Sequence, residues 1–397
     1  MQLNSPDVVI VGGGIVGACT AYFLAKKGVR VTVVEAGDIA AGASGSCDRA
    51  IMIQSKNPGL MMQMALAGAE IYRGLESELG AELEYNNAGG MILIENEEEM
   101  GVMEQIVKRQ RAAGIDVRII GRREAQERQP AVSPHILGST YWDGDADVNP
   151  MRVCLAMAGA ARTLGARFLL HTRVSGFLTD KGRVAGVRTS GGDISSDTVL
   201  IAAGAWSPEL GQMAGVNIPI VPRKGQILVT EPLPPLIRGN VLSGSYIASK
   251  HNPELAGKDN VIKKKLGIGL SLGQTRSGNL LVGGSRQFAE YDRSTNVDAV
   301  RAIAENAARL FPVLKNVRII RTFAGLRPYT PDGLPILGPA PERPGLFIAA
   351  GHEGDGIALG PFTGRLMAEV LTGGNHGWDL RPFRPERFTA TGPEKTN

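Results

Sequence analysis

The chain has 397 residues, of which 43% are hydrophobic and 21% are charged, so it can bury a sizeable core and extensive disorder is excluded. The formal net charge is +4, without a long basic block and with few aromatic residues, which argues against a nucleic-acid-binding protein. Cys19, Cys47 and Cys154 lie far apart and the five histidines are scattered, so neither a metal site nor a disulfide framework is predicted.

The amino-terminal residues 1–6 are polar and show no secretory signal. No apolar stretch reaches the ~18 residues that a transmembrane helix needs. The sequence therefore predicts a cytoplasmic protein without a membrane span.

The first element pattern is strand, glycine-rich turn, helix and strand. Residues 8–11 and 31–34 are short apolar runs rich in valine, which predicts buried parallel strands. Residues 15–27 between them read as a helix that ends at Gly28. This order predicts a βαβ unit of the kind that binds a dinucleotide.

Four residues of this unit carry the dinucleotide prediction. Gly12 permits a tight turn, Gly14 lets the backbone approach a pyrophosphate, and Gly17 lets the helix pack on the strand. The amino terminus of the helix favours an anion. Glu35 closes the second strand, where an acid would accept hydrogen bonds from an adenosine ribose, so a bound ADP moiety is expected.

This motif leaves open whether the cofactor is a nicotinamide or a flavin nucleotide. A second glycine and serine loop at 41–46 offers further N–H groups and a hydroxyl. Apolar strands recur at 198–203 and 347–350, and the latter leads into a glycine-rich loop at 351–357 and a helix in which Pro361 either causes a kink or falls near the first turn. Nucleotide-domain segments at the start, middle and end of the chain favour a cofactor that is buried along its whole length.

Further motifs occur in chain order: GGGIVG at 12–17, GASG at 42–45, AAGAWS at 202–207, KGQ at 224–226, YIASK at 246–250, AGLRPYTPDGLPILG at 324–338 and AAGHEGDGIALGPFTG at 349–364. With these motifs the chain resembles the D-amino-acid oxidase superfamily of flavoproteins, nearest to its glycine oxidase and sarcosine oxidase branch. The resemblance spans nearly the whole chain.

The resemblance implies an α/β fold of two domains. A Rossmann-like FAD-binding domain would comprise residues 1–85, 150–220 and 325–375. A substrate domain with a mostly antiparallel sheet would comprise 86–149 and 221–324, and 376–397 would form a tail. The residue pattern agrees independently, with strands expected at 91–94, 226–229 and 280–282 and amphipathic helices at 103–113 and 300–310.

The implied chemistry is oxidation of the C–N bond beside a carboxylate, with hydride transfer to flavin N5. Arg327 would bind the carboxylate through two hydrogen bonds, the alternative being a structural pair with Asp332. Tyr246 would donate to the same carboxylate, the alternative being a core aromatic. His352 would lie beside the flavin, with a catalytic or a structural role, and no side chain is an obvious base.

The expected site is larger than these catalytic candidates. Met52, Lys250 and Glu353 join Tyr246 and Arg327 as substrate-binding candidates. The expected cofactor-binding residues are Gly12, Gly14, Ile15, Val16, Gly17, Glu35, Ala36, Ala43, Ser44, Gly45, Val174, Ala203, Gly204, Trp206, Arg327, His352, Gly354, Asp355, Gly356 and Ile357.

The chain departs from the resemblance at three places. Gly354 stands where glycine oxidases carry an arginine, so Glu353 or Asp355 would either meet a cationic part of a larger substrate or cap the helix start. No cysteine stands at 327–328, where monomeric sarcosine oxidase tethers its flavin, so noncovalent FAD is expected. Residues 251–272, after the expected Tyr246 strand, resemble an insertion that would serve as a lid, a substrate loop or a partner contact.

The substrate therefore stays open among glycine, sarcosine, D-amino acids, D-proline or hydroxyproline, and opines. A free oxidase is one alternative, and a catalytic subunit that passes electrons to partner subunits or a quinone is another. A noncatalytic flavin-binding subunit and a nicotinamide dehydrogenase, which would be colourless, are the remaining alternatives. Homo- and hetero-oligomers are both left open.

Overall fold

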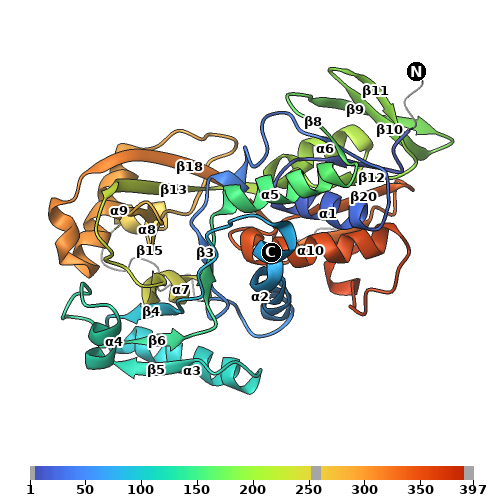
Figure 1. Cartoon of the computed structure of the whole chain (residues 1–397). Coiled ribbons are helices and arrows are strands. Elements are labelled where there is room, and N and C mark those ends of the chain that lie inside the picture. Colours follow the sequence, from blue (N-terminus) through green and yellow to red (C-terminus); the bar gives the residue numbers. More distant parts are fainter. Residues whose placement is uncertain (1–4, 252–260, 389–397) are drawn as a thin grey trace, which may run out of the picture.

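The computed structural model describes residues 5–251 and 261–388. One of its two large sheets has six strands in the order β19-β20-β12-β1-β2-β8, parallel except for β19 against β20 (Figure 1). The strands are β1 (Val8–Val11), β2 (Val31–Val34), β8 (Arg167–Leu169), β12 (Val199–Ile201), β19 (Ile336–Pro339) and β20 (Leu346–Ala350). Segments from the start, middle and end of the chain thus pair in one sheet, and the predicted α/β class is confirmed.

The helices of this part pack closely on one another because small residues stand where they cross. In Figure 1, α1 lies beside both α5 and α10. A Cβ atom on Gly364 of α10 would come within 2.4 Å of the Cβ of Cys19 in α1, and one on Gly68 of α2 would come within 2.1 Å of the carbonyl oxygen of Ala358. The helices of this part are α1 (Ile15–Lys26), α2 (Leu60–Leu79), α5 (Pro150–Thr163), α6 (Ser207–Ala214) and α10 (Gly356–Leu371). Pro361 lies inside α10, which continues past it.

The second large sheet is mostly antiparallel, as predicted, because only β14 and β4 pair in parallel. Its order is β17-β13-β16-β15-β14-β4-β6-β5, and β18 also pairs with β13. Its strands are β4 (Gly90–Ile94), β5 (Arg118–Gly121), β6 (Gly138–Trp142), β13 (Val221–Pro232), β14 (Asn240–Ser243), β15 (Ser271–Gln274), β16 (Asn279–Gly283), β17 (Gln287–Phe288) and β18 (Ile319–Tyr329).

Two small sheets complete the strands: β9 (Val174–Asp180), β10 (Arg183–Thr189) and β11 (Gly192–Ser195) form one, and β3 (Ala50–Ile51) and β7 (Ala146–Asp147) form the other. The remaining helices are α3 (Glu97–Ala112), α4 (Arg122–Arg128), α7 (Gly244–His251), α8 (Val261–Leu266) and α9 (Val297–Leu310). Helices α3 and α9 begin before the predicted starts because Asn96 and Asn296 cap them: each side chain accepts a hydrogen bond from a backbone N–H of the first turn.

The prediction that Tyr246 lies in a strand was wrong. Strand β14 ends at Ser243, and the Ser243 hydroxyl accepts a hydrogen bond from the backbone N–H of Tyr246 at 3.4 Å, so the chain turns into helix α7. The expected insertion 251–272 includes 252–260, which lie outside the described residues, so its role stays a prediction. The tail 376–397 is described only as far as residue 388.

Within the described ranges, no helix combines the length and the apolar character needed to cross a bilayer. No group of three or more metal-binding side chains occurs in these ranges either. The domain boundaries and the cytoplasmic location stay predictions.

Candidate active site

A cavity lies where the carboxyl ends of the parallel strands meet the antiparallel sheet. Residues at the ends of β1, β2, β12 and β20 line one part of it, and residues of β13, β15, β16 and β18 line the other. Carboxyl ends of parallel strands are the usual place for a ligand in such sheets. Of the predicted site residues, the cavity is lined by Gly12, Gly14, Ile15, Val16, Glu35, Ala36, Ala43, Ser44, Met52, Val174, Ala203, Gly204, Trp206, Tyr246, Arg327, His352, Glu353, Gly354, Asp355, Gly356 and Ile357.

Two predicted cofactor-binding residues, Gly17 and Gly45, do not line the cavity. A Cβ on Gly17 would lie 2.0 Å from the carbonyl oxygen of Gly12, and one on Gly45 would lie 2.4 Å from that of Ala40. Both glycines therefore permit close backbone packing, and their contact with the cofactor stays a prediction. The side chain of Lys250 lies outside the described part of the chain.

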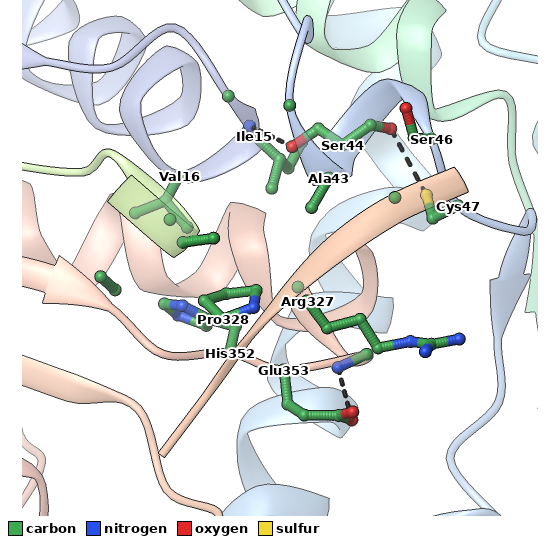
Figure 2. Close-up of a pocket in the computed structure, with 18 of the residues that line it drawn as sticks. Ile15, Val16, Ala43, Ser44, Ser46, Cys47, Arg327, Pro328, His352 and Glu353 are labelled. Carbon is green, nitrogen blue, oxygen red and sulfur yellow. Dashed lines mark hydrogen bonds between the residues drawn. The ribbon is translucent and has the colours of Figure 1, made fainter. Parts of the chain in front are cut away.

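One end of the cavity presents backbone N–H groups and an acid. The Glu35 carboxylate accepts hydrogen bonds from the N–H groups of Gly13 at 2.6 Å and Gly37 at 2.7 Å. The Ser44 hydroxyl accepts one from the N–H of Ile15 at 3.0 Å, which ties the second glycine loop to the start of α1 (Figure 2). Neither α1 nor α10 carries an acidic residue in its first turn. The amino-terminal ends of α1 and α10 therefore offer backbone N–H groups without a nearby acidic side chain in the first turn. Such helix ends favour an anion, which fits an elongated dinucleotide with a pyrophosphate.

The loop before α10 is held by two ion pairs. Glu353 pairs with Arg223 of β13. The Asp355 carboxylate lies 2.6 Å from the Nζ of Lys56, and these side chains are only 11% and 5% exposed. The negative charges of Glu353 and Asp355 are thus matched by protein cations, which removes the reason to expect a cationic substrate group there. Asp355 also makes no side-chain cap hydrogen bond to α10.

Arg327 enters the cavity from β18, and Figure 2 shows it between Glu353 and the segment of Ser46 and Cys47. Its Nη1 donates to the carbonyl oxygen of Ser285 at 3.0 Å. A Cβ on Gly225 would lie 2.4 Å from that nitrogen, so the glycine of the KGQ motif leaves room for the guanidinium.

The alternative of a structural pair between Arg327 and Asp332 does not hold. Asp332 pairs with Arg387 at 2.6 Å instead. The guanidinium of Arg327 therefore remains directed to the cavity.

Tyr246 and Met52 line the same end of the cavity as Arg327, and an electrostatic interaction links Tyr246 to Arg327. Met52 is buried. The Cζ of Arg286 lies 3.6 Å from the centre of the Tyr246 ring. The aromatic ring is therefore covered on one side by a second guanidinium.

The sequence prediction missed Asp48 and Arg286, which also line the cavity. Asp48 accepts a hydrogen bond from the Ser271 hydroxyl at 2.6 Å and interacts electrostatically with Arg327. Asp48 follows the GASG loop by three positions, and Arg286 follows a Gly-Gly-Ser turn at the end of β16. A charged residue next to a glycine turn was the available signal, but it is common in surface loops.

His352 is 3% exposed, and its Nε2 lies 3.0 Å from the Thr363 hydroxyl in α10. Burial lowers the pKa of His352 to about 4. The imidazole is therefore neutral at neutral pH, and its contact with α10 supports a role in positioning the loop.

This histidine predicts a pH dependence of stability. Between the unfolded pKa of 6.5 and the folded pKa of about 4, the unfolded chain binds more protons than the native chain. The free energy of unfolding therefore falls as the pH falls through this window, by up to about 1.4 kcal/mol per pH unit. In His352→Gln the amide can still reach Thr363. We expect its free energy of unfolding, measured by denaturant at several pH values, to change less steeply with pH than that of the wild-type protein. The same change of unfolding free energy with pH in both proteins would show that His352 does not cause this dependence.

The comparisons with known proteins agree with this site. The family model described as "FAD dependent oxidoreductase" matches residues 7–370. Glycine oxidase of Geobacillus kaustophilus is 32% identical over 388 residues, covering 95% of this chain and 96% of that protein. Hydrogen cyanide synthase subunit HcnC of Pseudomonas aeruginosa is 31% identical, covering 96% of each. The crystal structure of L-proline dehydrogenase from P. horikoshii has a TM-score of 0.87 at 29% identity, covering 97% of this chain and 98% of that one.

These matches confirm the resemblance and decide between the two kinds of cofactor that the glycine motif left open. The cofactor is FAD, and the protein is an oxidoreductase that acts on amino acids. The chain belongs to the FAD dependent oxidoreductase family.

Proposed function

We propose that the chain oxidises the C–N bond beside the carboxylate of an amino or imino acid. The observation that carries this proposal is Arg327, whose guanidinium faces the cavity beside Tyr246 and is not consumed by Asp332. A guanidinium binds a carboxylate through two parallel hydrogen bonds, which orients the substrate as well as attracting it. Bound FAD would supply the redox chemistry, the acceptance of a hydride from the carbon that carries the amine.

The chain's own residues divide the remaining work. Glu35 would hold the adenosine ribose, the starts of α1 and of the Ser44 loop would hold the pyrophosphate, and the start of α10 would face the pyrimidine edge of the flavin. Asp48 would accept hydrogen bonds from the substrate amino group, because its carboxylate lines the cavity and accepts hydrogen bonds only from the Ser271 hydroxyl and the backbone N–H of Ala50 among the described residues. Met52 would bound the pocket on its apolar side.

We infer that FAD is held noncovalently although Cys47 lines the cavity. Burial raises the pKa of the Cys47 thiol well above its ordinary value, so little of the nucleophilic thiolate forms. Acid precipitation of the protein should leave the flavin in the supernatant, and a yellow pellet would contradict this inference.

The test of the proposed reaction is an anaerobic visible spectrum of the purified protein. The panel comprises glycine, sarcosine, D-amino acids, both prolines, hydroxyproline isomers and N-carboxyalkyl amino acids. Bleaching of the flavin band by one of these amines is expected. A flavin band that none of them bleaches would contradict the proposed reaction and favour a noncatalytic flavin-binding subunit.

A second candidate function is that of a catalytic subunit within a larger complex. The similarity to HcnC, which is named as a subunit, supports it. Readmitting air after anaerobic bleaching separates the two candidates. Rapid return of the flavin colour identifies an oxidase, whereas slow return together with copurifying subunits identifies a dehydrogenase with another acceptor.

A further inference from the structure

Arg286 is a cavity residue that the proposed reaction does not use. Its backbone N–H donates to the carbonyl oxygen of Leu266 at 2.9 Å, so the residue is held where the segment after β16 meets the end of α8. Its guanidinium stacks on the Tyr246 ring and donates from Nη1 to the Tyr246 carbonyl oxygen at 3.3 Å. Its Nε is buried and has no hydrogen-bond partner. A buried donor without a partner costs free energy unless a ligand satisfies it.

The Nε of Arg223 is also buried without a hydrogen-bond partner, but the neighbouring cations differ from Arg286 in that each forms an ion pair with an acidic side chain. Arg223 pairs with Glu353, Lys224 pairs with Asp292 at 2.6 Å, and Lys56 pairs with Asp355 at 2.6 Å. Among the residues that the structure describes, no acidic side chain forms an ion pair with Arg286 or Arg327. Two guanidinium groups of one cavity thus remain without an ion-pair partner, and Asp48, which interacts electrostatically with Arg327, is the one carboxylate counted against them below.

The two guanidinium groups belong to the same end of the cavity. The carbonyl oxygen of Ser285, the residue before Arg286, accepts the hydrogen bond from Arg327. Tyr246 interacts with both arginines. One ligand can therefore reach both groups.

The charges at this end specify the ligand further. After the matched pairs are set aside, Asp48, Arg286 and Arg327 leave a net charge of +1. A zwitterionic amino acid with one carboxylate has no net charge and would leave one guanidinium uncompensated. An amino acid with two carboxylates carries −1 and neutralises the site, which avoids the cost of an uncompensated charge in a partly buried cavity.

We infer that the substrate is an amino or imino acid with a second carboxylate, which Arg286 binds while Arg327 binds the carboxylate beside the oxidised C–N bond. This inference rests on the proposed function, because it takes Arg327 as the site of the first carboxylate. The second carboxylate is carried either on the side chain or on the substituent of the nitrogen. Arg286 would bind a carboxylate in either position in the same way, and the ligand pairs described next distinguish the two positions.

The experiment uses ligands that differ only in the second carboxylate. Glutarate and pentanoate are the unreactive pair, and their binding to the flavin-loaded protein is followed as a perturbation of the visible spectrum. Iminodiacetate and N-ethylglycine are the reactive pair with a nitrogen-linked group, and aspartate and 2-aminobutyrate are the pair with a side-chain group. Both are followed by anaerobic bleaching.

In the wild-type protein, glutarate is expected to bind about 10- to 100-fold more tightly than pentanoate. In at least one of the two reactive pairs, the dicarboxylate is expected to bind more tightly than the monocarboxylate by about the same ratio. Arg286→Gln should bring this ratio close to one. Arg286→Lys keeps the positive charge but loses the planar guanidinium that stacks on Tyr246, so it should retain part of the preference for the dicarboxylate. Arg301→Gln removes one positive charge from the exposed face of α9 and is the matched control, for which the full ratio is expected.

Equal binding of dicarboxylates and their partners in the wild-type protein would overturn the inference, as would a ratio that survives Arg286→Gln. If no amine bleaches the flavin while glutarate still binds more tightly than pentanoate, the dicarboxylate site stands and the proposed reaction fails. If single-carboxylate amines bleach the flavin and no ratio is seen, the reaction stands and the dicarboxylate site fails.

Discussion

Replacing Arg327 by lysine is expected to lower kcat/KM for the oxidised amino acid by about 10²- to 10³-fold, while the flavin content stays at the wild-type level. Lysine keeps the positive charge but offers a point charge in place of a planar pair of donors, so the substrate carboxylate is attracted and not oriented. Part of the loss should appear as a raised KM and part as a lowered kcat, because a misoriented substrate presents its C–N bond poorly.

The measurement is steady-state kinetics together with the ratio of flavin to protein absorbance. Arg301→Lys on the exposed face of α9 makes the same chemical change away from the cavity and should leave both quantities unchanged. Wild-type turnover in Arg327→Lys would remove Arg327 from the substrate site. A colourless Arg327→Lys protein would show instead that Arg327 is needed to retain FAD.

Replacing Gly17 by alanine is expected to abolish FAD retention and to lower the free energy of unfolding by more than about 3 kcal/mol. The new Cβ would lie 2.0 Å from the carbonyl oxygen of Gly12 and 3.1 Å from its carbonyl carbon, both backbone atoms that cannot move aside without displacing the glycine turn. The turn and the start of α1 would shift together, and the site for the pyrophosphate would be lost.

Gly74→Ala is the matched control for this substitution. Gly74 also lies in a helix, α2, but a Cβ there meets nothing within 4 Å. Alanine should therefore raise the free energy of unfolding by about 0.5–1 kcal/mol through its better helix propensity. Thermal or denaturant unfolding and the flavin absorbance measure both variants. A Gly17→Ala protein that keeps FAD and stability would show that α1 can move away from β1 without loss.

The positions of the charged side chains in the cavity bear on the substrate, which family membership alone leaves open. Gly354, where the resemblance to glycine oxidases implies an arginine, lies beside Arg327, since a Cβ on Gly354 would lie 3.5 Å from the Cδ of Arg327. Arg286, which follows β16 and stacks on Tyr246, supplies a second guanidinium to this cavity from another part of the chain. Cation placement, more than the fold, is therefore expected to separate this chain from glycine oxidases in substrate choice.

Sequence periodicity predicted the elements whose signals are local. The strands at 8–11 and 31–34 are found at those bounds, and α1 ends at Lys26, one residue before the predicted end. A buried parallel strand is a short apolar run and its helix begins at a glycine turn, so neither needs information from distant residues. The helix at Tyr246 was missed because its start depends on the Ser243 side chain, a signal that β-type residues around it obscure.

The sequence by itself determined the βαβ unit, the dinucleotide site and, through its motifs, the resemblance to FAD-dependent amino-acid oxidoreductases. Tertiary structure alone decided which charges remain for a ligand. Glu353 is matched by Arg223, which lies 130 residues away, and Asp355 is matched by Lys56, whereas Arg286 comes into the cavity without an acidic partner. Pairing of buried charges depends on distances between strands and loops that are far apart in the chain, and no local pattern encodes those distances.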